Sequence, residues 1–256
     1  MSETSSGPTH PPSPSRDGCI LAIETATTTA RVAVLDRGGA RRAAREATAE
    51  RHSSNLLRLC DEVLREAGIV PAALDAIACG AGPGSFTGLR VGLAVGKGLA
   101  LPSARPFLLV SSLAALALDI LRTADTVRPG ADAPIAVPCI DAGKGQIYAG
   151  LFRAEGTSLV VSIGQEWVLA PGELLPATPA DAALRIAGNG ADRYAAVIDG
   201  ALATRERARR LEVSGPTAES VGRLALLRLA RGEVDSLESA VPAYGRAPDI
   251  TKPRRG

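Results

Sequence analysis

The sequence predicts an α/β fold made of two lobes that are built alike. Three observations predict it: each half opens with three short β-type runs, each continues with helical periodicity and a further strand, and the composition is globular. Hydrophobic residues make up 46% of the 256 residues and charged residues 22%, so the chain can bury a sizeable core. A length of 256 residues suits one large domain or two small ones.

The first half of the chain predicts a three-stranded meander followed by a helix and a strand. Apolar runs over 19–25 and 30–36 flank a threonine-rich turn, and 41–49 is a third, more exposed strand. Apolar residues at helical spacing predict a helix over 54–67, which serines can cap and a glycine and a proline end. The buried run over 74–80 predicts the next strand.

A glycine-rich segment over 80–102 joins this half to the next and is expected to contain a helix. The elements predicted beyond it are, in order, a strand (107–111), a helix (112–123), three strands (134–141, 146–154 and 158–170), a short helix near 171–175, a strand (183–188) and a long helix (218–231).

Four segments are expected along the chain. Residues 1–18 are rich in Ser, Thr and Pro and predict a disordered tail. The N-terminal lobe is expected over 19–110 and the C-terminal lobe over 111–240, and 241–256 is expected to be an irregular basic tail.

Composition excludes several classes of function. Lys and Arg number 29 against 27 Asp and Glu, and aromatic residues make up 3%, so a protein that binds nucleic acid alone is disfavoured. The chain has two histidines, which argues against a histidine-based metal site. No apolar run spans a bilayer and no export signal is visible, so we expect a cytoplasmic protein. The four cysteines are expected to be buried free thiols, and they are Cys19, Cys60, Cys79 and Cys139.

The glycine-rich segment matches neither common nucleotide motif. Its spacing fits neither the Walker A loop nor the Rossmann fingerprint. Its helix carries a stripe of small residues, because Gly88, Gly92 and Gly96 fall every fourth residue. Each interior glycine costs about 0.5–1 kcal/mol relative to alanine, so the stripe needs a compensating contact. That contact is either this chain's own sheet or a helix of another subunit.

The amino-acid sequence of this glycine-rich segment resembles that of a known family. GAGPGSFTGLRVG followed by KGLA resembles the TsaB (YeaZ) proteins of bacterial tRNA threonylcarbamoyladenosine synthesis. Other stretches agree in order, and they are ILAIETATTTARVAV, ERHSSNLL, IDAGKGQIYAG, AGNGA and PAYGRAPDIT. The resemblance covers about residues 19–251.

The resemblance implies a fold and a set of partners. The fold is of the actin/sugar-kinase/Hsp70 (ASKHA) type, with two lobes that each hold a mixed sheet and flanking helices. TsaB proteins are regarded as non-catalytic relatives of the transferase TsaD, with which they pair, and the ATPase TsaE joins them. We therefore expect a heterodimer with a TsaD-type transferase, a TsaE-type ATPase, indirect contact with tRNA, and a homodimer when the chain is alone.

Two positions support a non-catalytic role. In TsaD a metal-binding HxxxH follows the strand after the glycine helix, and here Ser112 and Leu116 stand at the corresponding positions. Leucine offers no metal ligand and a lone serine hydroxyl is a poor one. The first strand ends in Glu24, where many members of the superfamily have Asp. No tightly bound cofactor is expected, and ATP or ADP is expected, if present, at the interface of the complex.

Four residues remain candidates for facing a nucleotide. Glu24 is one, and Asp141 either bonds its own backbone in a turn or faces the nucleotide. Gly188 and Gly190 form either a turn or the vestige of an adenosine loop. The basic clusters at 205–210 and 252–255 either contact tRNA phosphates or are solvated. Two rival functions stay open, a glycoprotease-type metallopeptidase and a small-molecule kinase of the same fold.

The partner interface is expected on the N-terminal lobe. The helix over 54–67 has more apolar residues than one buried stripe needs, and the glycine helix carries leucines around its bare stripe. The resemblance indicates the same lobe. The residues predicted to contact the partner are Leu56, Leu59, Cys60, Val63, Gly88, Leu89, Gly92, Leu93 and Gly96.

Overall fold

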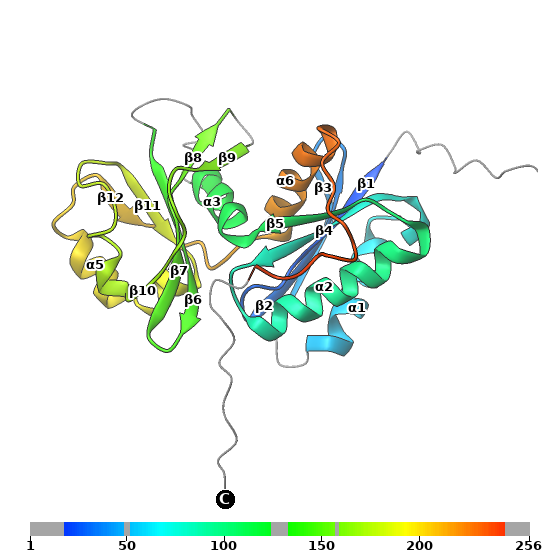
Figure 1. The fold of residues 1–256 in the computed structure, drawn as a ribbon, viewed down its shortest axis with the longest axis horizontal. Coiled ribbons are helices and arrows are strands. Elements are labelled where there is room, and N and C mark those ends of the chain that lie inside the picture. Colours follow the sequence, from blue (N-terminus) through cyan, green and yellow to red (C-terminus); the bar gives the residue numbers. More distant parts are fainter. Residues whose placement is uncertain (1–17, 49–51, 124–132, 157–158, 244–256) are drawn as a thin grey trace, which may run out of the picture.

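The computed structural model describes residues 18–48, 52–123, 133–156 and 159–243, and these form two α/β lobes (Figure 1). Each lobe holds one mixed sheet with helices packed against it. The predicted fold class, two mixed sheets with flanking helices, is confirmed. Among the described residues, no helix has the length and apolar character needed to span a bilayer.

The N-terminal lobe is built on a five-stranded sheet with the order β3-β2-β1-β4-β5. The first three strands form an antiparallel meander, whereas β4 lies parallel to both β1 and β5. Parallel neighbours require crossover connections, which the helices of this lobe provide. The strands are β1 (Cys19–Glu24), β2 (Thr29–Asp36), β3 (Arg41–Thr48), β4 (Leu74–Gly82) and β5 (Phe107–Ser111).

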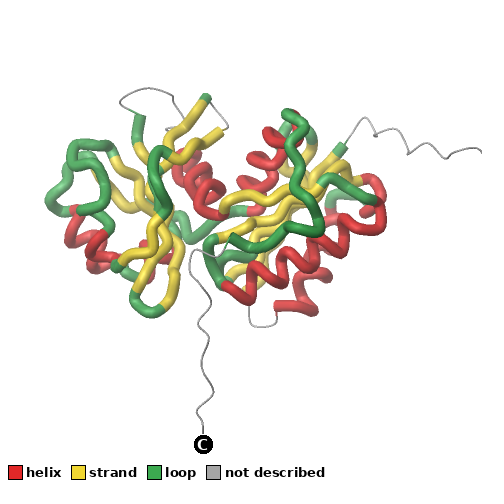
Figure 2. Tube along the Cα trace, in the orientation of Figure 1, coloured by secondary structure: helices red, strands yellow, loops and turns green. Residues whose placement is uncertain are grey.

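Helices cover both faces of this sheet, as Figure 2 shows. On one face lie α1 (His52–Glu66) and α2 (Phe86–Ala100), whose apolar side chains pack on alternate residues of the strands. On the other face lies α6 (Ala218–Ala230). Because both faces are covered, the central strand β1 is buried at every position.

The C-terminal lobe begins with α3 (Ser112–Thr123) and holds a seven-stranded sheet. Its main path runs β10-β7-β6-β11-β12, and β8 pairs with β6 and β9. The α3 helix packs on one face, and α4 (Asn189–Arg193) and α5 (Ala195–Leu202) pack on the other. The strands are β6 (Ile135–Gly143), β7 (Gln146–Ala149), β8 (Phe152–Glu155), β9 (Leu159–Ser162), β10 (Trp167–Leu169), β11 (Leu184–Ala187) and β12 (Ala208–Arg210). Single 3-10 turns are η2 (Pro71–Ala73), η3 (Leu101–Ser103) and η4 (Pro171–Glu173).

The C-terminal lobe differs from its prediction in detail. The runs 146–154 and 158–170, each expected as one strand, are divided, because β7 pairs with β10 whereas β8 pairs with β9. The helices α4 and α5 and the strand β12 were not predicted. Each is short, and α5 buries only Ile198 and Leu202 and contains a glycine, so it has little helical periodicity.

The division of the chain between the lobes needs a correction. The C-terminal lobe was predicted over 111–240, but α6 packs against β1 and β2 of the N-terminal lobe. The physical reason is that the second face of that sheet would otherwise expose its apolar residues, and Gly222 lets the helix approach Leu35 closely. The predicted boundary at 110 falls one residue before the end of β5.

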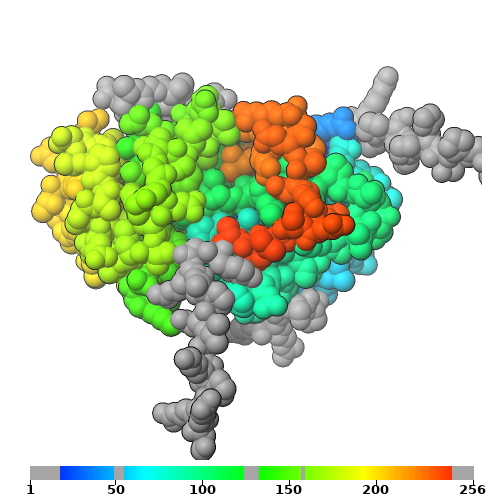
Figure 3. Space-filling view, viewed as in Figure 1, coloured from blue at the N-terminus to red at the C-terminus, as the bar shows by residue number. Residues whose placement is uncertain are grey.

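The chain after α6 also stays with the N-terminal lobe. Figure 3 shows residues near 240 lying across that lobe. The backbone N–H of Asp235 donates to the carbonyl of Phe107 at 2.8 Å, and that of Ala243 donates to the carbonyl of Ala81 at 2.8 Å. The predicted tails lie almost wholly outside the described residues, which begin at 18 and end at 243.

Candidate functional site

The nine residues predicted to contact a partner are buried inside this chain. Most of them pack between the helix pair α1 and α2 and the five-stranded sheet, and of the nine only Cys60 also lines the groove described below. Leu89 packs with the opposite core cluster, beneath the sheet, and is also fully buried. The nine predicted residues found to be buried are Leu56, Leu59, Cys60, Val63, Gly88, Leu89, Gly92, Leu93 and Gly96.

The glycine stripe of α2 fits against this chain's own sheet. A Cβ on Gly88 would overlap the carbonyl oxygen of Thr25, and one on Gly92 would overlap the Thr25 hydroxyl. A Cβ on Gly96 would overlap the sulfur of Cys79. Of the two contacts left open by the sequence, the structure shows the internal one. The spacing of the glycines indicates a close approach but does not say which element approaches.

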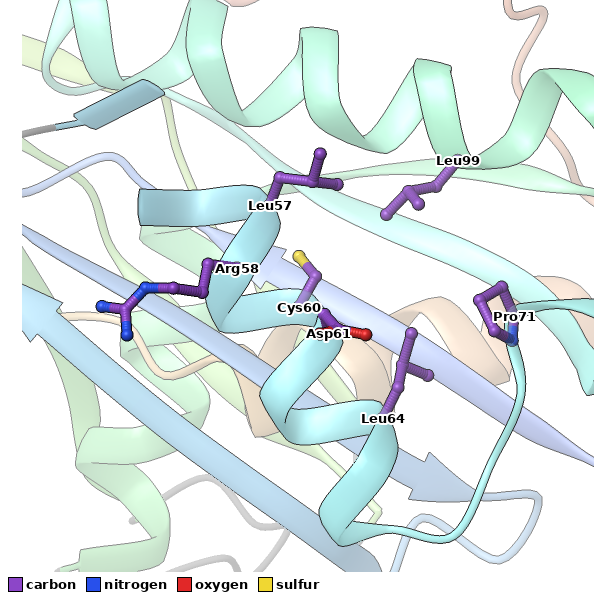
Figure 4. A pocket seen from close by; sticks show the side chains of 7 residues that line it. All are labelled: Leu57, Arg58, Cys60, Asp61, Leu64, Pro71 and Leu99. Atoms are coloured by element: carbon purple, nitrogen blue, oxygen red, sulfur yellow. The ribbon is translucent and has the colours of Figure 1, made fainter. Parts of the chain in front are cut away.

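The outer surface of the same helix pair carries a groove of about 520 Å³. Figure 4 shows Leu57 of α1 and Leu99 of α2 pointing toward one another across it, while Arg58 extends away. We call this the α1–α2 groove, and its lining residues are Leu57, Arg58, Cys60, Asp61, Leu64, Pro71 and Leu99.

Apolar residues around the groove are unusually exposed for their type. The Leu57 side chain is 53% exposed. Val70 precedes the lining residue Pro71 and is 63% exposed, and Leu101 lies two residues after the lining residue Leu99 and is 71% exposed. Exposed apolar patches with a charged rim mark interaction sites. The sequence contained a signal for Leu57, because consecutive helix positions are rotated by about 100°, so Leu56 and Leu57 cannot both face the core.

Glu24, predicted as a nucleotide-facing residue, lies in the interior and is fully buried. One oxygen of its carboxylate accepts from the backbone N–H of Ala26 at 2.7 Å, and the other accepts from the Ser112 hydroxyl at 2.8 Å. The Ser112 oxygen in turn accepts from the N–H of Gly82 at 3.2 Å. Burial raises the pKa of Glu24 to about 7, and these hydrogen bonds oppose the rise.

The other three nucleotide candidates lie together in the C-terminal lobe. Asp141 accepts from the Arg193 guanidinium at 2.7 Å and from the N–H of Gly143 at 3.1 Å, so it bonds its own turn as well as a neighbouring helix. Gly188 and Gly190 lie against the backbone of β6, where a Cβ on Gly188 would overlap the carbonyl oxygen of Cys139. Close packing therefore accounts for both glycines.

The α3 helix contacts both Glu24 of the N-terminal lobe and the region of Gly188 in the C-terminal lobe. Ser112 holds Glu24, and one turn later the Leu116 side chain lies 2.7 Å from where a Cβ of Gly188 would stand. Both α3 residues are fully buried. The positions compared with the HxxxH histidines are thus used for packing the lobes, and the described residues contain no group of three His, Cys, Asp or Glu side chains suited to a metal.

The residues here do not fit a nucleotide held within this chain. Glu24 is enclosed, and the two glycines leave no cradle because the backbone of β6 fills the space beside them. In the 205–210 cluster, Arg205 donates to backbone carbonyls and Arg210 is paired with Asp192 and Asp199. The cluster at 252–255 lies outside the described residues.

Comparison with known proteins identifies the relatives of this chain. The family model for TsaD, tRNA N6-adenosine threonylcarbamoyltransferase, matches residues 44–203. The tRNA threonylcarbamoyladenosine biosynthesis protein TsaB of Haemophilus influenzae is 35% identical over 131 residues, which is 50% of this chain and 51% of that protein. The solved structure of YeaZ from Pseudomonas aeruginosa is 32% identical with a TM-score of 0.73, covering 88% of this chain and all of that one. The chain belongs to the TsaB/YeaZ family.

Membership in the TsaB/YeaZ family agrees with the two-lobed fold. The TsaB protein of Escherichia coli is 32% identical over 152 residues, 59% of this chain and 62% of that protein. The matched stretches thus span about half to three-fifths of these two curated relatives. The stretch of this TsaB/YeaZ chain that the TsaD family model matches includes α1, α2 and α3, the first two of which form the α1–α2 groove.

Proposed function

We propose that this chain is a non-catalytic scaffold subunit in bacterial tRNA threonylcarbamoyladenosine synthesis, which binds and activates a TsaD-type transferase. The observation that carries the proposal is the α1–α2 groove, an apolar groove of about 520 Å³ on the outer side of the N-terminal lobe. Family membership supports a role in tRNA threonylcarbamoyladenosine synthesis, and the groove is the surface that we propose for binding the partner.

The groove suits a helix pair of similar shape. Its apolar centre is lined by leucines from both helices, and Arg58 and Asp61 place charges of both signs at its margin. An apolar centre within a charged rim is the usual anatomy of a specific protein interface. A TsaD-type transferase matches the same family model over this region, so its corresponding helices can oppose α1 and α2 in a four-helix contact.

A non-catalytic role is supported by the residues at the start of α3. The Ser112 hydroxyl is engaged with Glu24 and Leu116 is enclosed in the core, so neither is placed to hold a metal. The side chain of Glu24 is likewise enclosed. The groups that would orient an activated donor are therefore left to the transferase.

The remaining parts of the proposal concern the assembly. A TsaE-type ATPase joins the pair, tRNA is contacted through the transferase, and ATP or ADP is held at the interface of the complex. The chain alone forms a homodimer through the same groove, because a twofold axis would bring the same exposed apolar patch of two copies together and remove it from water. The assembly acts in the cytoplasm.

Reconstitution tests the proposal. The purified chain is mixed with the TsaD-type protein of its own organism, and co-elution is measured together with threonylcarbamoyl transfer to tRNA. We expect a stable complex, strong transfer by the complex, and none by this chain alone. Transfer at full rate without this chain would overturn the proposal.

A charge placed in the groove tests the surface itself. Leu57→Glu puts a carboxylate on an exposed position of α1, so the fold is retained while an apolar contact is lost. The matched control is Val197→Glu, an equally exposed apolar position on α5 of the other lobe. Burying an unpaired charge is costly, so we expect partner affinity to fall at least tenfold for Leu57→Glu and to be unchanged for the control. Equal affinity for both variants would remove the groove from the interface.

A further inference from the structure

A second pocket lies on the opposite face of the N-terminal sheet from the α1–α2 groove. It has a volume of about 460 Å³ and is formed by the turn after β2, the end of α3 and the outer side of α6. Its lining includes three arginines, which are Arg37, Arg122 and Arg223. It also includes an apolar wall on α6, made of Leu226, Leu227 and Ala230.

The positive charge in this pocket is not matched by carboxylates within it. Among the described residues that line it, none is acidic. Arg223 is half-buried, and its pKa is lowered, first by burial and then by the nearby Arg122, while the nearby Glu219 and Asp119 oppose this lowering. Neither Arg122 nor Arg223 forms an ion pair or hydrogen bond with any residue in the described part of the chain.

The nearest carboxylates are engaged elsewhere. Asp75 accepts from Arg37 at 2.7 Å at the margin of the pocket, and Glu219 accepts from Arg41 at 3.4 Å. Asp119 is buried and accepts from the backbone and hydroxyl of Thr217 and from the Ser220 hydroxyl. The carboxylates of Glu219 and Asp119 attract Arg223 but are bonded to other groups, so Arg122 and Arg223 face the cavity without a direct ion pair within the described residues.

We propose that this pocket binds an organic phosphate ester, with the phosphate against Arg122 and Arg223 and the organic part against Leu226 and Leu227. Guanidinium groups bind phosphate oxygens with paired, charge-assisted hydrogen bonds. A cavity of about 460 Å³ is within the usual range of about 300–1,000 Å³ for small-molecule sites. The apolar wall distinguishes the site from a simple anion site, because it has nothing to offer a bare inorganic ion.

The proposal goes beyond the scaffold role and does not depend on it. The α6 helix covers one face of the sheet, whereas α1 and α2 cover the other, so partner and phosphate ester bind at separate surfaces. A phosphate ester is supplied either by a small molecule or by an RNA backbone, and the test separates these two sources.

Titration of the full chain tests the site with three probes, which are phenyl phosphate, inorganic phosphate and a ten-nucleotide RNA. We expect phenyl phosphate to bind more tightly than inorganic phosphate, because only the former reaches the leucine wall. Binding of RNA as well would assign the ester to an RNA backbone, and binding of phenyl phosphate alone would assign it to a small molecule. Absence of binding by both esters at millimolar concentration would overturn the proposal.

Single variants locate the binding. Arg122→Gln and Arg223→Gln are each expected to weaken phenyl phosphate binding about tenfold or more, because each removes a charge-assisted contact. The control is Arg90→Gln on α2, an exposed arginine on the opposite face of the sheet. Leu227→Ala is expected to weaken the binding of phenyl phosphate but not the binding of inorganic phosphate.

Arg122 lies at the end of its helix without a described hydrogen bond, so its variant stays folded even if Arg223→Gln does not. Unchanged binding by folded Arg122→Gln would contradict the site.

Discussion

Ser112, the first residue of α3, donates a hydrogen bond of 2.8 Å to Glu24, the last residue of β1. These residues are 88 positions apart and belong to different lobes, so one buried hydrogen bond ties the start of the C-terminal lobe to the central strand of the N-terminal one. The contact also gives the chain a buried titratable group with a defined pH response.

Glu24→Gln is expected to flatten the pH dependence of stability. The pKa of Glu24 rises from 4.5 to about 7 in the folded state, so the folded state holds the proton more tightly than the unfolded state does. The contribution of this group is fully present below pH 4.5 and is lost as pH rises through 7, by on the order of 3 kcal/mol. Urea unfolding at pH 5 and pH 8 measures it. An equal loss of stability in wild type and variant over this range would contradict the expectation.

Gly92→Ala is expected to destabilise the chain, because the added methyl group overlaps the Thr25 hydroxyl under α2. Overpacking of this kind costs about 1–3 kcal/mol. Gly98→Ala in the same helix is the control, since no atom lies within 4 Å of its Cβ position, and it should gain about 0.5–1 kcal/mol from helix propensity. Thermal unfolding of the pair measures both. A stable Gly92→Ala with weakened partner binding would return the glycine stripe to the interface.

Asp119→Ala is expected to loosen the contact between α3 and α6. The Asp119 carboxylate accepts from the N–H and hydroxyl of Thr217, which caps α6, and from the Ser220 hydroxyl. Removing it leaves several buried donors without an acceptor, at about 1–3 kcal/mol for each unsatisfied group. Asp199→Ala removes an exposed ion pair with Arg210 and should cost about 1 kcal/mol or less. Similar unfolding midpoints for the two variants would argue against a structural role for Asp119.

The four cysteines are expected to resist alkylation in the folded state. All four are buried free thiols, and burial raises the pKa of Cys60 to about 12. Because the thiolate is the reactive form, a thiol reagent at pH 8 should modify none of them until denaturant is added. Mass spectrometry before and after unfolding counts the modified residues. Rapid labelling of Cys60 in the folded chain would mean that α1 and α2 move enough to expose this thiol to the α1–α2 groove.

The sequence predicted the elements of the N-terminal lobe well and the location of contacts poorly. Continuous apolar runs, such as 19–25 and 107–111, became strands close to the predicted limits, because local composition decides them. The sequence identified Glu24 as a polar residue at the end of a strand. It could not show that Ser112, 88 positions away in the chain, forms a hydrogen bond with its buried carboxylate. The glycines of α2 indicated a close contact but did not identify the element that makes it. The sequence also did not show which of Leu56 and Leu57 faces solvent, and in the structure Leu56 is buried while Leu57 is exposed.

The return of α6 to the first sheet has a consequence for synthesis on the ribosome. The chain completes the entire C-terminal lobe before residues 218–230 emerge, and until then one face of the five-stranded sheet lacks its covering helix. A nascent chain therefore carries an incomplete first lobe until α6 has been made, with apolar strands open to chaperones. Because that lobe also bears α1 and α2, the α1–α2 groove belongs to a lobe that is completed only after the C-terminal lobe has been made.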